Sequence, residues 1–163
     1  MMSQANVEPS VQIRLMRWWD IPAVATLENA LFPTDAWSEE QFWGELALET
    51  RVYLTAEQAG QVIGYAGAFV LAPDSDLQTI AVDPSAQGAG TGRRLLTELM
   101  ALVSERGAES MMLEVRADNS PAIAFYERMG FERISTRARY YADGTDAQIW
   151  RRRPLALDRE VLA

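Results

Sequence analysis

The segment from Gln87 to Arg93 has the residue types and spacing of a loop that binds a phosphate group. It reads Gln87-Gly88-Ala89-Gly90-Thr91-Gly92 and is followed by Arg93. Glycine lets the backbone approach a ligand closely and adopt conformations that other residues avoid. An apolar run from Leu77 to Val82 precedes the segment and a helix-like run follows it, and the unpaired N–H groups at a helix start bind anions. This order predicts a pyrophosphate site, although a plain turn before a helix would have a similar sequence.

The chain lacks two common pyrophosphate-binding patterns. A Walker loop needs a lysine followed by serine or threonine after its last glycine, and this chain contains no lysine. A Rossmann fingerprint has the order G-x-G-x-x-G, whereas the glycines here are Gly88, Gly90 and Gly92. The segment is instead a Q-x-x-G-x-G loop, with Arg93 and Arg94 as the expected cations near the phosphates.

Two side chains further along could transfer protons. Glu114 lies near the end of an apolar run, Ser110 to Val115, and Tyr126 lies in the helix-like run that follows. A carboxylate can accept a proton, and a phenol with an unperturbed pKa of about 10 can donate one. Each also has a structural interpretation, because Glu114 could pair with Arg116 or lie in water and Tyr126 could pack in the core. Asn119, between them, could begin a helix or contact a ligand.

Composition narrows the chemistry further. The 163 residues include no cysteine and no histidine, which excludes disulfides, a cysteine nucleophile, a Ser-His-Asp triad and metal sites built on thiolate or imidazole. A general base must then be a carboxylate, a tyrosine or a water molecule, and we expect no metal. The net charge of −8 argues against non-specific nucleic-acid binding and is compatible with a basic substrate.

Length and hydropathy bound the organisation of the chain. A chain of this length suits one domain with a sizeable core, which we expect over residues 11–155, between a flexible leader (1–10) and a tail (156–163). No apolar run approaches the ~20 residues of a membrane span. The segment from Met1 to Pro9 lacks the apolar centre of a signal peptide, so we expect a cytoplasmic protein without a membrane partner.

The apolar patterns predict an α/β fold with the element order βααβββαβαββ. We expect Asp20 to cap the first helix, and Ser38 with Gln41 to form a capping box at the second. Strands are expected over 11–15, 51–56, 61–71, 77–82, 110–115, 131–141 and 148–150, and helices that end near 31, 48, 106 and 129.

This order predicts a central mixed β-sheet with helices on both faces. The strands over 77–82 and 110–115 flank a helix, so we expect a right-handed crossover and parallel pairing between them. Ligands bind beyond the carboxyl ends of such strands. Val82, the glycine loop and Glu114 should meet at that edge.

The joint pattern of Gln87-x-x-Gly90-x-Gly92 followed by Glu114-Val115-Arg116-x-x-Asn119 and Tyr126 resembles the GCN5-related N-acetyltransferase (GNAT) superfamily. Within it the chain is similar to the branch of ribosomal-protein-alanine N-acetyltransferases. The similarity is strong over 77–131 and weaker over 13–155, and it includes Phe32-Pro33 and the paired Tyr140-Tyr141.

The resemblance implies transfer of an acetyl group from acetyl-CoA, the co-substrate, to the α-amino group of an N-terminal alanine on a basic ribosomal protein. It implies direct attack by the amine, with Glu114 as the proton acceptor and Tyr126 as the proton donor. We expect the N–H of Val82 to hold the oxyanion, and Tyr140 and Tyr141 to wall the acceptor groove as strand residues. The contacts to acetyl-CoA that it implies are Ile80, Ala81, Val82, Gln87, Gly88, Ala89, Gly90, Thr91, Gly92, Arg93 and Asn119.

Two other interpretations remain open at the level of the sequence. The acceptor could be a small-molecule amine, since only the acceptor groove would differ. The chain could also be an acyl-CoA-binding module without turnover, although it carries candidates for both the base and the acid. A nucleotide-binding protein is less well supported, because the chain lacks the lysine and the metal ligands that such sites use.

Overall fold

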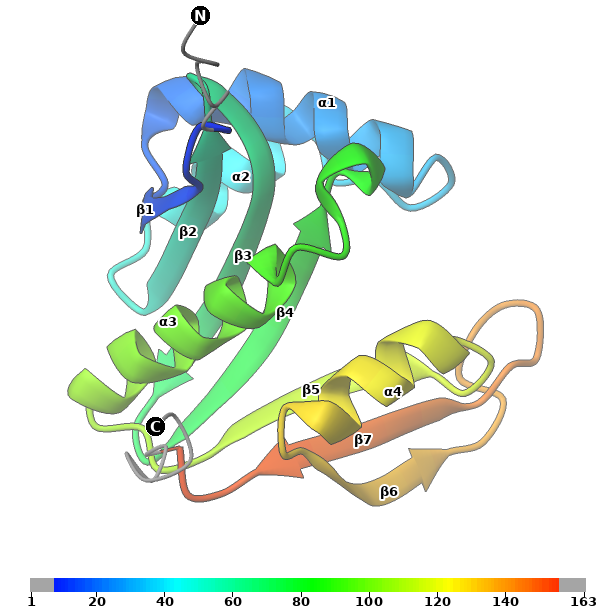
Figure 1. The fold of residues 1–163 in the computed structure, drawn as a ribbon. Helices are drawn as coiled ribbons and strands as arrows, with labels where there is room; N and C mark the ends of the chain where they lie inside the picture. Colours follow the sequence, from blue (N-terminus) through cyan, green and yellow to red (C-terminus); the bar gives the residue numbers. More distant parts are fainter. Residues whose placement is uncertain (1–7, 156–163) are drawn as a thin grey trace, which may run out of the picture.

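The computed structural model describes residues 8–155, which form a seven-stranded sheet with helices on both faces (Figure 1). The order βααβββαβαββ is confirmed, with short 3₁₀ turns before α1 and after β4. Residues 1–7 of the expected leader and the expected tail, 156–163, lie outside the described residues. The elements are β1 (Gln12–Leu15), α1 (Ile21–Leu31), α2 (Glu39–Leu46), β2 (Arg51–Gln58), β3 (Gln61–Leu71), β4 (Asp74–Val82), α3 (Thr91–Glu105), β5 (Met111–Arg116), α4 (Ser120–Arg128), β6 (Glu132–Arg137) and β7 (Ala147–Arg152).

The strands of the sheet separate in the middle. Their spatial order is β1-β2-β3-β4-β5-β7-β6, and β4 and β5 are the parallel pair, as predicted. These two strands are paired at a single position, Asp76 with Met112. Beyond it they diverge toward their carboxyl ends, and Figure 1 shows the sheet opening into a V between β4 and β5. The opening lies at the edge where the sequence predicts the ligand.

Each face of the sheet has its own core. Helices α3 and α4 cover one face, where Leu95, Leu96 and Leu99 are fully buried with apolar residues of β2 to β5. Leucines three and four positions apart share one side of a helix, which explains why α3 packs this way. Helices α1 and α2 cover the other face, where Ile21 and Phe42 belong to a second buried cluster. No helix within residues 8–155 is long and apolar enough to cross a membrane.

A bulge in β4 helps to separate the strands. Leu77 and Thr79 pair with the consecutive residues Ala68 and Gly67 of β3, so Gln78 is an additional residue in β4. A bulge bends its strand and increases the local twist. It also places residues three apart on one face, and the side chains of Leu77 and Ile80 both pack against the α3 side of the core.

Three local expectations are wrong. Strand β4 begins at Asp74, so the loop expected over 72–76 is shorter. Tyr140 and Tyr141 lie in the loop between β6 and β7 and not in a strand. Asp20 does not cap α1, because its carboxylate accepts hydrogen bonds from the Arg14 guanidinium at 2.7 Å and the Arg17 N–H at 2.8 Å, which close the turn before the helix.

The capping box of α2 is confirmed. The Gln41 N–H donates to Ser38 Oγ at 3.2 Å, and the Ser38 N–H donates to Gln41 Oε1 at 2.8 Å. The two bonds satisfy N–H groups that the start of a helix otherwise leaves free. They fix where α2 begins after the loop that follows α1.

The side chain of Tyr53 connects β2 to the bulge of β4. Tyr53 pairs with Gly67 of β3, and its ring lies so close that a Cβ on Gly67 would be 2.2 Å from Tyr53 Cε1. The Tyr53 hydroxyl lies 3.0 Å from Glu45 Oε2 of α2 and 3.0 Å from Gln78 Oε1. The absence of a side chain at Gly67 therefore lets Tyr53 reach across β3 and hold the bulge.

We predict opposite effects of alanine at two glycines. Gly67→Ala should lower the free energy of unfolding by about 1–3 kcal/mol, because the Tyr53 ring must move. Gly44→Ala, in α2, should raise it by about 0.5–1 kcal/mol, because nothing lies within 4 Å of its Cβ position and alanine favours the helix. Urea denaturation of both variants measures the difference, and equal stabilities would contradict the proposed packing of Tyr53.

Candidate active site

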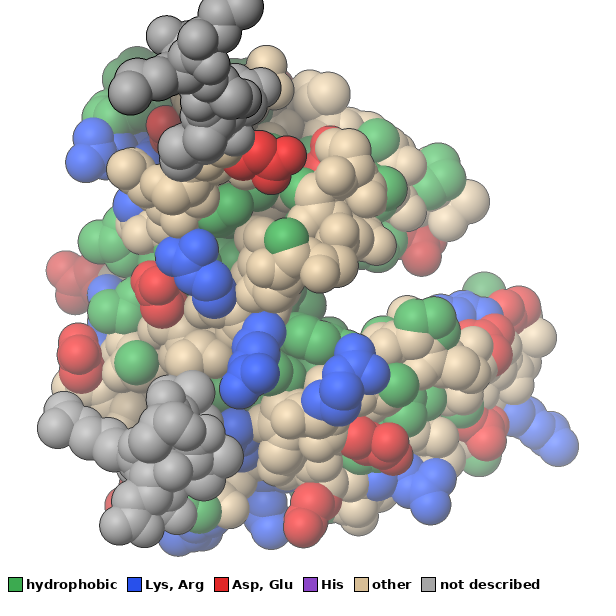
Figure 2. All heavy atoms as spheres, viewed as in Figure 1, with side chains coloured by type: hydrophobic (Ala, Val, Ile, Leu, Met, Phe, Trp, Pro, Cys, Tyr) green, Lys and Arg blue, Asp and Glu red, His purple; other side chains and the backbone are tan. Residues whose placement is uncertain are grey.

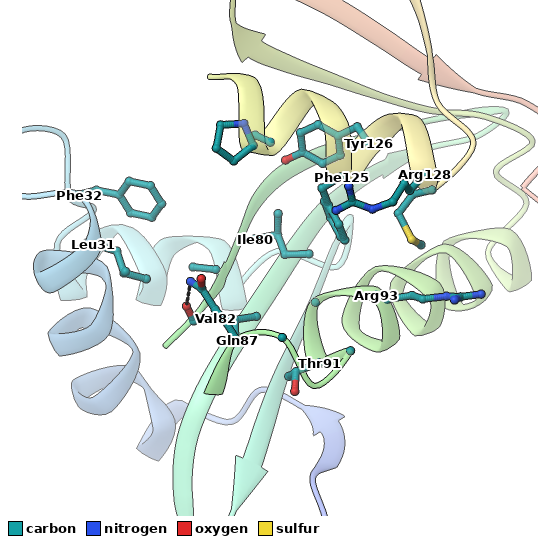
Figure 3. A pocket seen from close by; sticks show the side chains of 17 residues that line it. Leu31, Phe32, Ile80, Val82, Gln87, Thr91, Arg93, Phe125, Tyr126 and Arg128 are labelled. Carbon is teal, nitrogen blue, oxygen red and sulfur yellow. Dashed lines mark hydrogen bonds between the residues drawn. The ribbon is translucent and has the colours of Figure 1, made fainter. Parts of the chain in front are cut away.

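The V between β4 and β5 contains a cavity of about 700 Å³. Figure 2 shows the hollow from outside, with basic side chains gathered at its inner end, and Figure 3 shows its lining. One wall comes from β4, the glycine loop and the start of α3, and the facing wall comes from α4. The lining residues are Leu31, Phe32, Ile80, Ala81, Val82, Gln87, Gly88, Gly90, Thr91, Gly92, Arg93, Pro121, Ala122, Phe125, Tyr126, Arg128 and Met129.

The edge of β4 that faces the cavity has free backbone groups. The Asp83 N–H donates to Ile63 O of β3 at 2.7 Å. Since the direction of these groups alternates along a strand, the backbone groups of Val82 and Ile80 point away from β3, into the V. The side chain of Gln87 donates to Val82 O at 3.0 Å, as the dashed line in Figure 3 shows. The N–H groups of Val82 and Ile80 are thus available to an extended ligand.

The glycine loop adopts a backbone conformation that suits an anion. Gly88 and Gly90 have φ angles of 84° and 82°, in the left-handed region that favours glycine. Nothing lies within 4 Å of a Cβ built on either residue, so the space beside the loop is open. Gly90 precedes α3, and the first bond of the helix runs from the Arg94 N–H to Gly90 O at 3.0 Å. The N–H groups from Thr91 to Arg93 have no partner within the helix.

Two arginines border the cavity from opposite elements. Arg93 at the start of α3 and Arg128 on α4 both belong to its lining (Figure 3). Arg94, expected beside the phosphates, instead donates to Val11 O at 3.0 Å and does not line the cavity, since successive helical residues point about 100° apart. Arg128 was missed, although it lies three residues after Phe125 and shares its side of α4.

Tyr126 packs in the core and also lines the cavity. Its ring is 9 % exposed and packs between Phe125 and Phe131, with centroids 5.5 and 5.8 Å apart. Its hydroxyl end points into the cavity in Figure 3. Burial raises the pKa of Tyr126 from its ordinary value near 10 to about 12, and the phenol is protonated at neutral pH with or without this shift. A buried phenol at the wall of a cavity is suited to donate a proton.

Glu114 lies on the opposite face of β5 from Tyr126. Its neighbours Leu113 and Val115 are buried in the same core as Tyr126, so the alternation of the strand directs Glu114 away from that core. The Glu114 side chain is 33 % exposed and does not line the cavity. Its carboxylate lies 3.4 Å from Nη1 of Arg137 on β6 and does not form the alternative ion pair with Arg116.

The structure therefore does not bring the two proton-transfer candidates onto one wall. Paired strands separate the two faces over most of the sheet in residues 8–155, and the V between β4 and β5 is an opening between them. The cavity lining includes Leu31 and Ala81, which also pack on the α1 side of the sheet. The cavity thus extends from the face covered by α3 and α4 toward the face that carries Glu114.

Two predicted contact residues lie outside the cavity lining. Ala89 belongs to the glycine loop but is not among the lining residues. Asn119 precedes α4, and its Oδ1 accepts a hydrogen bond from the Ala122 N–H at 3.3 Å. Asn119 thus begins the helix, and its contact with a ligand stays a prediction.

Several apolar lining residues were not predicted as site residues. Leu31 ends α1 and Phe32 follows it, whereas Phe125 lies in α4 and Met129 directly follows that helix. The sequence singles out Phe32-Pro33 as part of a family resemblance, so a signal existed for Phe32. Leu31 and Met129 continue the apolar stripes of their helices and have no separate signal.

Comparison with known proteins identifies the family of the chain and supports its fold. Residues 15–131 match the Acetyltransferase (GNAT) family. The chain is 41% identical to the N-alpha-acetyltransferase RimI of Mycobacterium tuberculosis, over 91% of this chain and 95% of that protein. It is 43% identical, over 82% of its length, to an uncharacterized protein of Mycobacterium leprae, but it spans only 38% of that longer protein.

A solved structure shares the whole fold. The crystal structure of the ribosomal-protein-S18-alanine N-acetyltransferase from Escherichia coli superposes with a TM-score of 0.80 and 34% identity, over 94% of this chain and 99% of that one. The family match and this relative each cover most of the chain, and both include the glycine loop and α4. The chain therefore belongs to the Acetyltransferase (GNAT) family and is an acetyl-CoA-dependent N-acetyltransferase.

Proposed function

We propose that this enzyme acetylates the α-amino group of an N-terminal alanine on a basic ribosomal protein, in the cytoplasm. The observation that carries the proposal is similarity over nearly the full length of enzymes named for that reaction. The E. coli [ribosomal protein bS18]-alanine N-acetyltransferase is 35% identical over 85% of this chain and 93% of its own length. The positions of Glu114 and Tyr126, on opposite faces of β5 beside the V, are consistent with such a transfer.

The cavity has the features that acetyl-CoA needs. The free edge of β4 at Val82 and Ile80 can hydrogen-bond an extended pantetheine arm as a neighbouring strand would. The open glycine loop, the N–H groups at the start of α3 and the cations Arg93 and Arg128 suit the phosphates. The volume of about 700 Å³ lies within the usual range for small-molecule sites. Bound there, acetyl-CoA supplies an activated acetyl thioester.

Glu114 is the base that we assign to the acceptor amine. An α-amino group has a pKa near 8 and is mostly protonated at neutral pH, so it must lose a proton before it attacks. The Glu114 carboxylate is partly exposed beside Arg137 on the face opposite α4. An N-terminus that approaches on this face meets Glu114 before it reaches the V, and Glu114 can take the proton directly or through a water.

Val82 and Tyr126 are assigned to the charges that develop during transfer. The Val82 N–H faces the V and can stabilise negative charge on the acetyl oxygen as the amine attacks. Tyr126, on α4, can donate its proton to the sulfur that departs, because its phenol is protonated at neutral pH and its hydroxyl end lies at the cavity. Attack is direct, because the chain has no cysteine to carry the acetyl group.

The first experiment locates the acetyl group. The protein is incubated with acetyl-CoA and a basic peptide that begins with a free alanine, and mass spectrometry maps the product. The control is the same peptide with a blocked N-terminus and free lysines. Acetylation only at the free α-amine supports the proposal. Modification of neither peptide, with small amines accepted instead, would favour a small-molecule acetyltransferase, and acetyl-CoA binding without any transfer would favour a binding module.

Loss of either proton-transfer group should slow turnover without loss of co-substrate binding. Glu114→Gln and Tyr126→Phe should each lower kcat by about 10²–10⁴-fold, the usual contribution of a positioned acid or base. Equilibrium binding of acetyl-CoA should stay close to that of the wild type. A kcat within a few-fold of wild type for Tyr126→Phe would leave Tyr126 with core packing alone, and the same result for Glu114→Gln would remove it as the base.

Arg128 should contribute to acetyl-CoA binding, whereas Arg94 should not. Loss of a charge-assisted hydrogen bond weakens binding by about 1.5–3 kcal/mol, so Arg128→Gln should raise the Kd by roughly tenfold or more. Arg94→Gln removes the same charge from outside the cavity and is the matched control. Calorimetric titration with acetyl-CoA at low and moderate salt measures both. Equal losses for the two variants would indicate a general charge effect and contradict the assignment.

A further inference from the structure

The side chain of Arg116 holds the loop between β6 and β7, residues 138–146. Its Nη2 lies 2.5 Å from Asp143 Oδ2 and 3.0 Å from Thr145 Oγ1. The guanidinium carbon also lies 4.7 Å from the centre of the Tyr141 ring. The hydrogen bond from the Arg116 guanidinium lowers the pKa of Asp143 to about 2, because it stabilises the charged carboxylate. A residue of β5 thus contacts the loop at three separate side chains.

The loop is built to present these groups to Arg116. The Gly144 N–H donates to Tyr141 O at 2.9 Å, and the Tyr141 N–H donates to Thr145 O at 3.1 Å, which closes a tight turn. The Thr145 N–H donates to Asp143 Oδ1 at 3.0 Å, so one carboxylate oxygen orders the turn while the other binds Arg116. The turn has few contacts of its own with the core, because Asp143 and Gly144 are exposed.

The other end of the same loop lies beside Glu114. Arg137, the last residue of β6, reaches the Glu114 carboxylate at 3.4 Å, and its guanidinium carbon lies 5.6 Å from the Tyr140 ring. The rings of Tyr140 and Tyr141 meet edge to face with centroids 5.2 Å apart. Arg116 and Glu114 are alternate residues of β5 and share one face of the strand. The two tyrosines are therefore held next to the proposed base.

We propose that Arg116 is a positioning residue for the acceptor. It fixes the loop of residues 138–146 against β5, so that Tyr140 and Tyr141 form a wall for the acceptor N-terminus beside Glu114. The inference rests on the proposed function, since it concerns the acceptor half of the same site. Arg116 does not line the cavity and acts through the loop.

The geometry requires arginine at this position. Besides Asp143 and Thr145, the guanidinium binds the Asp118 carboxylate through Nε and Nη2, at 3.1 and 3.2 Å. A planar guanidinium can bind two carboxylates through its fork and stack on a ring at the same time. A lysine ammonium has the charge but not the fork or the flat face, so Arg116→Lys should restore only part of the effect.

The test separates acceptor binding from co-substrate binding. In steady-state kinetics, Arg116→Gln should raise the KM for the alanine peptide by about tenfold and leave the KM for acetyl-CoA unchanged. A small displacement of a substrate-positioning group can cost up to about a hundredfold, so the expected loss lies within that range. Asp143→Asn should act in the same direction, and the double variant should lose less than the sum of both. The control is Arg133→Gln. Arg133 is an arginine of β6 that forms no ion pair within the described part of the chain.

Hydrogen exchange gives a readout that does not depend on transfer. Arg116→Gln should speed exchange of the amides in 138–146, whereas Arg133→Gln should not. An unchanged acceptor KM, or an equal rise in both KM values, would overturn the proposal even if exchange changes. If the wild-type enzyme acetylates no peptide, the proposed function fails, and unchanged exchange in both Arg116→Gln and Asp143→Asn would then overturn the loop assignment as well.

Discussion

The site depends on one departure from regular structure, the parting of β4 and β5 after a single paired position. Parallel neighbours normally continue their hydrogen bonds to the end of the shorter strand. Here the bulge at Gln78 turns β4, and Tyr53 holds the bulge from across β3. The parting exposes backbone groups of β4 in the middle of a sheet and connects its two faces. The cavity, the free N–H groups of β4 and the opening toward the face that carries Glu114 all result from this separation.

The side chains assigned to the proposed reaction lie on different faces of the sheet. The face with α3 and α4 carries the glycine loop, Arg93, Arg128 and the buried ring of Tyr126. The other face carries Glu114, exposed enough to meet a solvated amine. The two side chains thus lie in different environments, a buried phenol on one face and a partly exposed carboxylate on the other.

Much of this arrangement could be predicted from the sequence, because the signals are local. The glycine loop, the capping box at Ser38 and the apolar stripe of α3 each depend on residues close together in the chain. The predictions that were wrong concern side chains whose contact partners are distant in the sequence. The Asp20 carboxylate binds Arg14 and does not cap the helix, and the Arg94 side chain binds Val11 O and does not face the glycine loop. Arg128 lines the cavity because α4 forms one of its walls. Tyrosine is common in strands, but Tyr140 and Tyr141 lie in a loop in which Arg116 contacts Tyr141 and Asp143.

The free edge of β4 also exposes the enzyme without acetyl-CoA to pairing with other extended chains. An unpaired strand edge is a template for any other extended chain, and proteins usually shield such edges with charge, bulges or a covering helix. Here the edge lies inside the sheet, and a ligand that runs along it would complete the sheet as an additional strand. Saturation with acetyl-CoA should therefore raise the melting temperature of this enzyme and suppress aggregation through strand addition between copies.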